Sequence, residues 1–113
     1  METEFNQAVE EWITYCRNSG ALFDSSAKAI INCEAYNKIL LMGHRALPLI
    51  RKLYDRDISD NFELEVIQGR GLLALVREIV GEDFQIPIEI RGNIHALEEY
   101  TKNWLDKNIN KYS

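Results

Sequence analysis

The stretch YNKILLMGHRALPLIRKLY, residues 36–54, has the strongest influence on how this chain folds. Tyr36, Ile39 and Leu40 recur at the spacing of one face of a helix. Gly43 comes next on that face, and glycine commonly ends a helix because it adopts a positive φ without strain. The stretch therefore predicts a helix that stops at Gly43 and a sharp turn after it.

A second helix is predicted after this turn. Ala46, Leu49 and Ile50 repeat the helical spacing. Pro48 lacks an amide hydrogen and clashes inside a helix, so it belongs in the first turn and the helix begins near Arg45 or Ala46. The link is then only two or three residues long, which makes the two helices antiparallel neighbours.

Residues 36–50 resemble the turn of a HEAT-type helical repeat, in which a helix ending in glycine is followed by a small residue, Leu-Pro and an apolar helix. More closely, their Tyr-x-x-Ile-x-x-Met-Gly-x-x-Ala-Leu-Pro-Leu-Ile pattern is similar to the core of a family of small, uncharacterised bacterial proteins. The similarity continues through Gly81, Pro87 and Trp104 and covers residues 5–106. It implies a bacterial all-α protein built of HEAT-like hairpins, and it implies no particular activity.

The rest of the chain predicts three further helices. Residues 4–18, 61–80 and 93–110 each carry an apolar stripe at helical spacing. Asp60 is expected to cap the helix of residues 61–80. The segment FELEV, residues 62–66, also alternates like a half-buried strand, but a single strand has no partner elsewhere in the chain. We therefore expect one all-α domain, residues 1–113, with about five helices in HEAT-like antiparallel hairpins.

Three segments are predicted to differ from regular helix. Residues 20–32 indicate a loop that lays Leu22, Phe23 and Ile30 on the core. Residues 82–92 contain a proline, which favours extended backbone before it, and we expect an extended apolar crossing loop there. The side chains expected to cover the core from this loop are Phe84, Ile86, Ile88 and Ile90. The last residues, from Asn108 onward, are expected to fray.

The charge pattern excludes some partners. The net charge is −5, and no run of Lys and Arg exceeds two residues. Nucleic-acid surfaces need clustered basic residues, so the composition disfavours such a partner. No apolar run approaches the ~18 residues of a membrane span. The acidic N-terminus, METEFNQ, lacks the features of a signal peptide. We expect a cytoplasmic protein with no membrane partner.

The positions of the cysteines and histidines do not indicate a catalytic site or a metal site. Cys16 lies on an apolar stripe and is expected to be a small buried hydrophobe. Cys33 lies at a helix start, which favours a lowered pKa and a reactive thiol. Together with His44 and His95, the two cysteines show none of the paired spacings of zinc sites. We therefore predict no catalytic residue, no metal site and no cofactor.

These observations favour a non-enzymatic protein-interaction module that binds a partner protein or a second copy of itself. A repeat array this short is near the lower limit of stability, so an incompletely capped apolar face would be an interface. The candidate partner-binding residues are His44, Arg45, Arg91 and Trp104. One alternative is a small regulatory or antitoxin-like nucleic-acid binder, with a basic stripe of Arg45, Arg51, Lys52 and Arg56. The other is an enzyme that uses Cys33 or His44.

Overall fold

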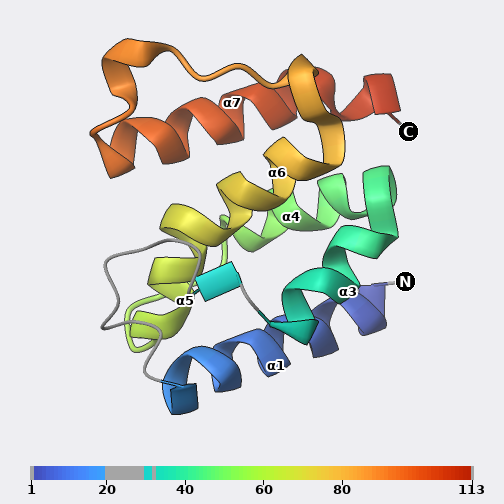
Figure 1. The fold of residues 1–113 in the computed structure, drawn as a ribbon, viewed down its shortest axis with the longest axis vertical. Helices are drawn as coiled ribbons and strands as arrows, with labels where there is room; N and C mark the ends of the chain where they lie inside the picture. Colours follow the sequence, from blue (N-terminus) through green and yellow to red (C-terminus); the bar gives the residue numbers. More distant parts are fainter. Residues whose placement is uncertain (1, 20–29, 32, 113) are drawn as a thin grey trace.

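The computed structural model of this protein describes residues 2–19, 30–31 and 33–112 (Figure 1). Every regular element in these ranges is helical, which confirms the all-α class. The α-helices are α1 (Glu2–Ser19), α3 (Glu34–Met42), α4 (Leu47–Leu53), α5 (Phe62–Val66), α6 (Leu72–Val80) and α7 (Ile94–Tyr112).

The expected count of five helices is wrong for the part of the chain that the structure describes. A 3₁₀ turn, Gly43–Ala46, joins α3 to α4, and a π-helical turn, Ile67–Gly71, joins α5 to α6. Four continuous helical segments result: α1, α3 with α4, α5 with α6, and α7. The difference arises because a 3₁₀ turn with its own hydrogen bonds replaces the open link expected after Gly43, whereas residues 61–80 were expected to form one helix.

The turn at Gly43 has the predicted backbone. Gly43 has φ +65° and ψ −144°, and its amide donates to the carbonyl of Leu40. Pro48 lies in the first turn of α4, where it displaces no intrahelical hydrogen bond. In Figure 1 the chain changes direction between α3 and α4. The glycine and the proline together therefore set the position of this turn.

The helices pack in three levels. Figure 1 shows α1 and α7 on opposite sides of the molecule, with α4 and α6 between them. α1 contacts α3 and α5, α6 contacts both α3 and α7, and α7 also lies against α4. The apolar faces of all these helices meet in one core. α6 is therefore the element that joins the two sides of the molecule.

Trp12, on α1, belongs to this core. Its side chain is fully buried, and its indole N–H donates to the carbonyl of Ile30 at 2.8 Å. Its ring meets the edge of Tyr36 with centroids 5.5 Å apart. Ile30 is buried, as expected, whereas Leu22 and Phe23 lie outside the described residues. Trp12 is thus a packing residue and is not available to a partner.

The segment FELEV is helical. Asn61, and not Asp60, caps it: the Asn61 side chain accepts from the amide of Leu64 at 3.0 Å. The two glycines that follow allow close approach of other helices. A Cβ at Gly71 would lie 2.6 Å from the Trp12 ring, and one at Gly69 would lie 3.3 Å from side-chain atoms of α7. Gly69 and Gly71 are therefore packing contacts inside a helical segment.

Residues 82–92 only partly match the expected crossing loop. An extended stretch lies between two 3₁₀ turns, Gly81–Asp83 and Ile88–Ile90. Phe84 is buried as expected, but Ile88 is 74% exposed and does not cover the core. The short helical turn rotates Ile88 away from its neighbours, so strict alternation along the loop does not hold.

The expected fraying at the C-terminus is wrong, since α7 continues to Tyr112. The ring of Tyr112 lies 4.6 Å from that of His44, measured between centroids. Its hydroxyl donates to the carboxylate of Asp83. These tertiary contacts hold the last turn of the helix, which local sequence does not reveal.

Candidate protein-interaction surface

Ion pairs hold most of the basic side chains in the described ranges. The pairs are Arg17–Glu63, Lys38–Glu11, Arg51–Asp55, Arg51–Asp106, Lys52–Glu2, Arg56–Glu10, Lys102–Glu99 and Lys111–Asp83. Three of the four residues of the suggested basic stripe, Arg51, Lys52 and Arg56, are among them. Their charges are matched by carboxylates, so this stripe does not present a free positive surface to phosphates.

The described basic residues outside these pairs are Arg45, Arg70, Arg77, Arg91 and Lys107, and three of these arginines lie on one surface. Arg70, Arg77 and Arg91 form no ion pair or side-chain hydrogen bond with any residue that the structure describes. All three line one hollow of about 800 Å³ between α6 and the start of α7. A second hollow of about 580 Å³ shares Arg77 and Arg91 with the first and continues toward Phe84. We call the two hollows together the α6–α7 groove.

The walls of the α6–α7 groove are mainly aliphatic. The apolar side chains that line its first hollow are Ile31, Leu73, Ala74, Ile94 and Leu97. Ile94 is 44% exposed, and a Cβ at Gly92 would meet no atom within 4 Å, so this end of the groove is open. Water-exposed aliphatic surface beside free guanidinium groups is suited to a ligand that carries both apolar and acidic groups.

Two acidic residues also line the groove. The carboxylate of Glu78 accepts a hydrogen bond from the hydroxyl of Tyr36 at 3.0 Å. Burial, and to a smaller extent this hydrogen bond, raises the pKa of Tyr36 well above its usual range, so the hydroxyl stays a donor at physiological pH. Glu82 lines the second hollow only. The first hollow is therefore lined by three arginines that have no acidic partner among the described residues. Its one carboxylate, that of Glu78, accepts a hydrogen bond from Tyr36.

The four residues expected to bind a partner fall in two places. Arg91 lines the α6–α7 groove. His44 and Trp104 both stack near Tyr112, with centroids 4.6 and 6.1 Å from its ring. Trp104 also meets the edge of the buried Phe84 at 5.2 Å. His44 and Trp104 thus contact the C-terminal turn, while Arg45, the residue after His44, is exposed.

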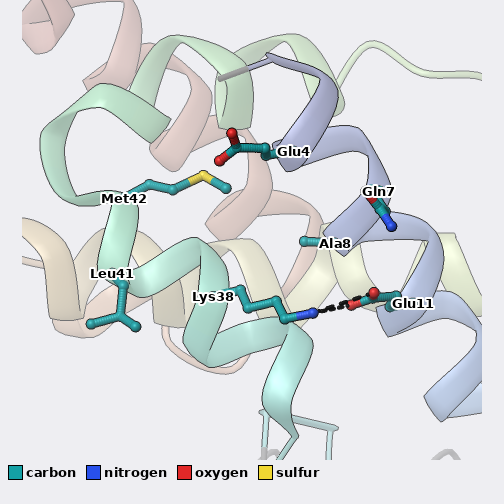
Figure 2. A pocket seen from close by; sticks show the side chains of 7 residues that line it. All are labelled: Glu4, Gln7, Ala8, Glu11, Lys38, Leu41 and Met42. Atoms are coloured by element: carbon teal, nitrogen blue, oxygen red, sulfur yellow. Dashed lines mark hydrogen bonds and ion pairs between the residues drawn. The ribbon is translucent and has the colours of Figure 1, made fainter.

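A third hollow, of about 390 Å³, lies between α1 and α3 (Figure 2). Lys38 reaches across it to Glu11, with Nζ 3.0 Å from the carboxylate. Glu4 is on the same rim, and Leu41, which is 87% exposed, points away from α1. The basic group of this hollow is neutralised and its remaining charge is acidic.

Cys33 and His44 do not come together. They lie at opposite ends of α3, separated by on the order of 15 Å along the helix axis. Burial raises the pKa of Cys33, although the backbone amides of Tyr36 and Ala35 act in the other direction. The expectation that the helix start lowers this pKa is therefore wrong, and the geometry offers no Cys–His dyad. Within the described ranges no three His, Cys, Asp or Glu side chains are grouped to hold a metal ion.

Burial of Cys16 leads to a pH-dependent stability. Burial raises the pKa of the Cys16 thiol from 9.0 to about 11, with smaller contributions from Cys33 and Glu63. Between these values the unfolded chain loses the proton that the folded chain keeps, so stability is lost as the pH rises through this range. We expect the wild type to lose about 2 kcal/mol more than Cys16→Ala between pH 9 and pH 11, measured by urea unfolding. Equal losses in both proteins would show that Cys16 is not desolvated.

Comparisons with protein-family models, curated proteins and solved structures find no match for this chain. Across residues 2–19, 30–31 and 33–112, no helix has the combined length and apolar character that a membrane span requires. The case for a function therefore depends on the chemistry of the surface.

Proposed function

We propose that this protein is a non-enzymatic interaction module that binds a segment of a partner protein in the α6–α7 groove. The proposal is based on one observation. Arg70, Arg77 and Arg91 line one exposed aliphatic groove and have no acidic partner among the residues that the structure describes, while most other described basic residues are in ion pairs. A surface that leaves such groups unmatched is typical of a site completed by another molecule.

The shape of the groove favours a peptide segment over a small molecule. Its two hollows share residues and extend along α6 from Gly69 to Gly81. A helix or extended peptide docked in such a groove contacts it through a few anchor side chains. A HEAT-like arrangement of the helices stays a prediction, and it fits this function because solenoid repeats bind partners along extended surfaces. The cytoplasmic location also stays a prediction.

Self-association is the weaker candidate. Leu41 is exposed beside the α1–α3 hollow and offers an apolar contact for a second copy. A twofold contact places the same patch on both sides. It would therefore bring Glu4 and Glu11 of one copy near those of the other, which is unfavourable. We expect a monomer in sedimentation velocity at micromolar concentration; a dimer that Leu41→Ser dissociates would contradict this expectation.

Photo-crosslinking tests the proposed function directly. A photo-reactive amino acid with a small aliphatic diazirine side chain, which does not fill the groove, replaces Gly92, where there is open space, or Lys107, an exposed residue outside the groove. In cells that make the protein naturally, we expect a discrete crosslinked product from position 92 and none from position 107. Arg77→Glu should abolish the product from position 92. Equal products from both positions, or products that Arg77→Glu leaves unchanged, would contradict a groove-based interaction.

A further inference from the structure

The geometry points to the chemistry of the groove's occupant: we infer that it is an acidic amphipathic helix of a partner protein. On this helix, two carboxylates one heptad apart flank a bulky aliphatic or aromatic side chain. This inference rests on the proposed function, because it names the partner for the same α6–α7 groove. The charge, the spacing and the polymer type of the partner each follow from the residues that line the groove.

The charge of the groove requires an anionic partner. Guanidinium groups bind carboxylates through paired hydrogen bonds, and Arg70, Arg77 and Arg91 have no such partner within the described part of the chain. The protein as a whole carries −5, so a local excess of positive charge is not a general property of its surface. Glu78, the carboxylate in the first hollow, is bonded to Tyr36. With three arginines against this one glutamate, the net charge of the residues that line the first hollow is positive.

The spacing of the arginines sets the pattern of the partner. Arg70 and Arg77 are seven residues apart on one continuous helix, so they lie on one face about 10 Å apart. Leu73 and Ala74 lie between them on the same side and line the groove. A partner helix laid along α6 would match this face with acidic residues at i and i+7 and an apolar residue at i+3 or i+4. Arg91 lies across the groove and can bind a third carboxylate.

The walls favour a protein over a nucleic acid. Single-stranded nucleic acids stack their bases on exposed aromatic rings; no aromatic ring lines the first hollow, and Phe84, which lines the second, is buried against Tyr100 and Trp104. Duplexes need many basic residues along a phosphate track. An aliphatic groove with three arginines is instead suited to apolar anchors framed by carboxylates.

Peptide selection tests the inference even while the partner is unidentified. Random peptides of ~15 residues, long enough to form a helix, are selected on the wild type and counter-selected on Gly92→Trp. The tryptophan fills the open end of the groove, and Gly92 has neither a positive φ nor a close neighbour that would oppose the substitution. We expect enriched peptides with Asp or Glu at i and i+7 around a large apolar residue.

The affinities of the enriched peptides then test the acidic-helix inference separately from the proposed groove-binding function. Arg70→Gln and Arg77→Gln should each weaken binding about tenfold, because each substitution removes a charge-assisted hydrogen bond to a carboxylate of the peptide. Arg77→Lys should restore part of the loss. Lys107→Gln, which removes an exposed charge outside the groove, should leave affinity unchanged. Circular dichroism confirms that each variant is folded.

Three outcomes would overturn the inference. Peptides that Gly92→Trp excludes but that lack acids and ignore the arginine substitutions would refute the acidic helix and leave the proposed function standing. Peptides that bind Gly92→Trp as well as the wild type, or no enrichment at all, would refute both. Arginine-dependent binding of a mixed-sequence RNA oligonucleotide, tighter than that of any peptide, would show that the groove is a nucleic-acid site.

Discussion

Replacing Gly71 with alanine should lower the free energy of unfolding by about 3 kcal/mol, the upper end of the usual cost of overpacking. The added Cβ would lie 2.6 Å from Cζ2 and Cη2 of Trp12. Trp12 has little freedom to move, since it is fully buried and its indole N–H is bonded to the carbonyl of Ile30. The clash therefore has to be relieved by separating α1 from the helix that contains Gly71. Urea unfolding followed by circular dichroism measures the effect.

A double-mutant cycle makes this prediction specific. Trp12→Phe removes the two clashing atoms, so Gly71→Ala should cost less in that background than in the wild type. Gly92→Ala is the matched control, because its Cβ meets no atom within 4 Å and its cost should be within about 0.5 kcal/mol of zero. A cost for Gly71→Ala that is the same with Trp12 and with Phe at that position would contradict the contact.

Gly43→Ala should cost about 1–3 kcal/mol for a different reason. Gly43 has φ +65° and ψ −144°, a conformation that residues with a Cβ rarely adopt. A Cβ there meets no atom within 4 Å, so the whole cost is conformational. Denaturant unfolding should show a lower midpoint with an unchanged m-value. The cost should be the same in the Trp12→Phe background, in contrast to that of Gly71→Ala.

Gly81→Ala provides a comparison within the chain. Gly81 has φ +65° and ψ −131°, again with no atom near an added Cβ. Its substitution should cost an amount similar to that of Gly43→Ala. If Gly43→Ala is instead as mild as Gly92→Ala, the backbone between α3 and α4 does not need a positive φ, and the basis for the turn is lost.

Local rules predicted the parts of the fold that depend on neighbouring residues. The turn at Gly43 and the place of Pro48 in the first turn of α4 both depend on atoms within a few residues. The apolar stripes also identified the buried face of each helix. These features were predictable because hydrogen-bond geometry and side-chain period act over one or two turns.

Features that depend on tertiary contacts were missed. The π-helical turn Ile67–Gly71 coincides with burial of Gln68, whose side chain donates to the carbonyl of Leu53 at 2.9 Å. Nothing in the local pattern distinguishes this glutamine from an exposed one. The last turn of α7 is likewise held by contacts of Tyr112 with His44 and Asp83, which are distant in sequence.

The candidate site was predicted only in part. Arg91 was among the expected residues, but Arg70 and Arg77 were not. Their spacing of seven residues around Leu73 was a local signal that they share a face of the helix. That Arg91 faces them across a groove depends on how the loop before α7 packs on α6, which sequence spacing does not encode. Whether each arginine has an acidic partner is also decided only by the fold.

The central claim is that the α6–α7 groove binds the partner, and an amide chemical-shift map tests it most directly. The ¹⁵N-labelled protein is titrated with the peptide that the selection enriches most strongly. We predict that the largest shift changes fall in residues 69–77 and 91–97, and that Gly92→Trp removes them. Largest changes at the α1–α3 hollow around Lys38, or around His44 and Tyr112, with the groove unaffected, would contradict this claim.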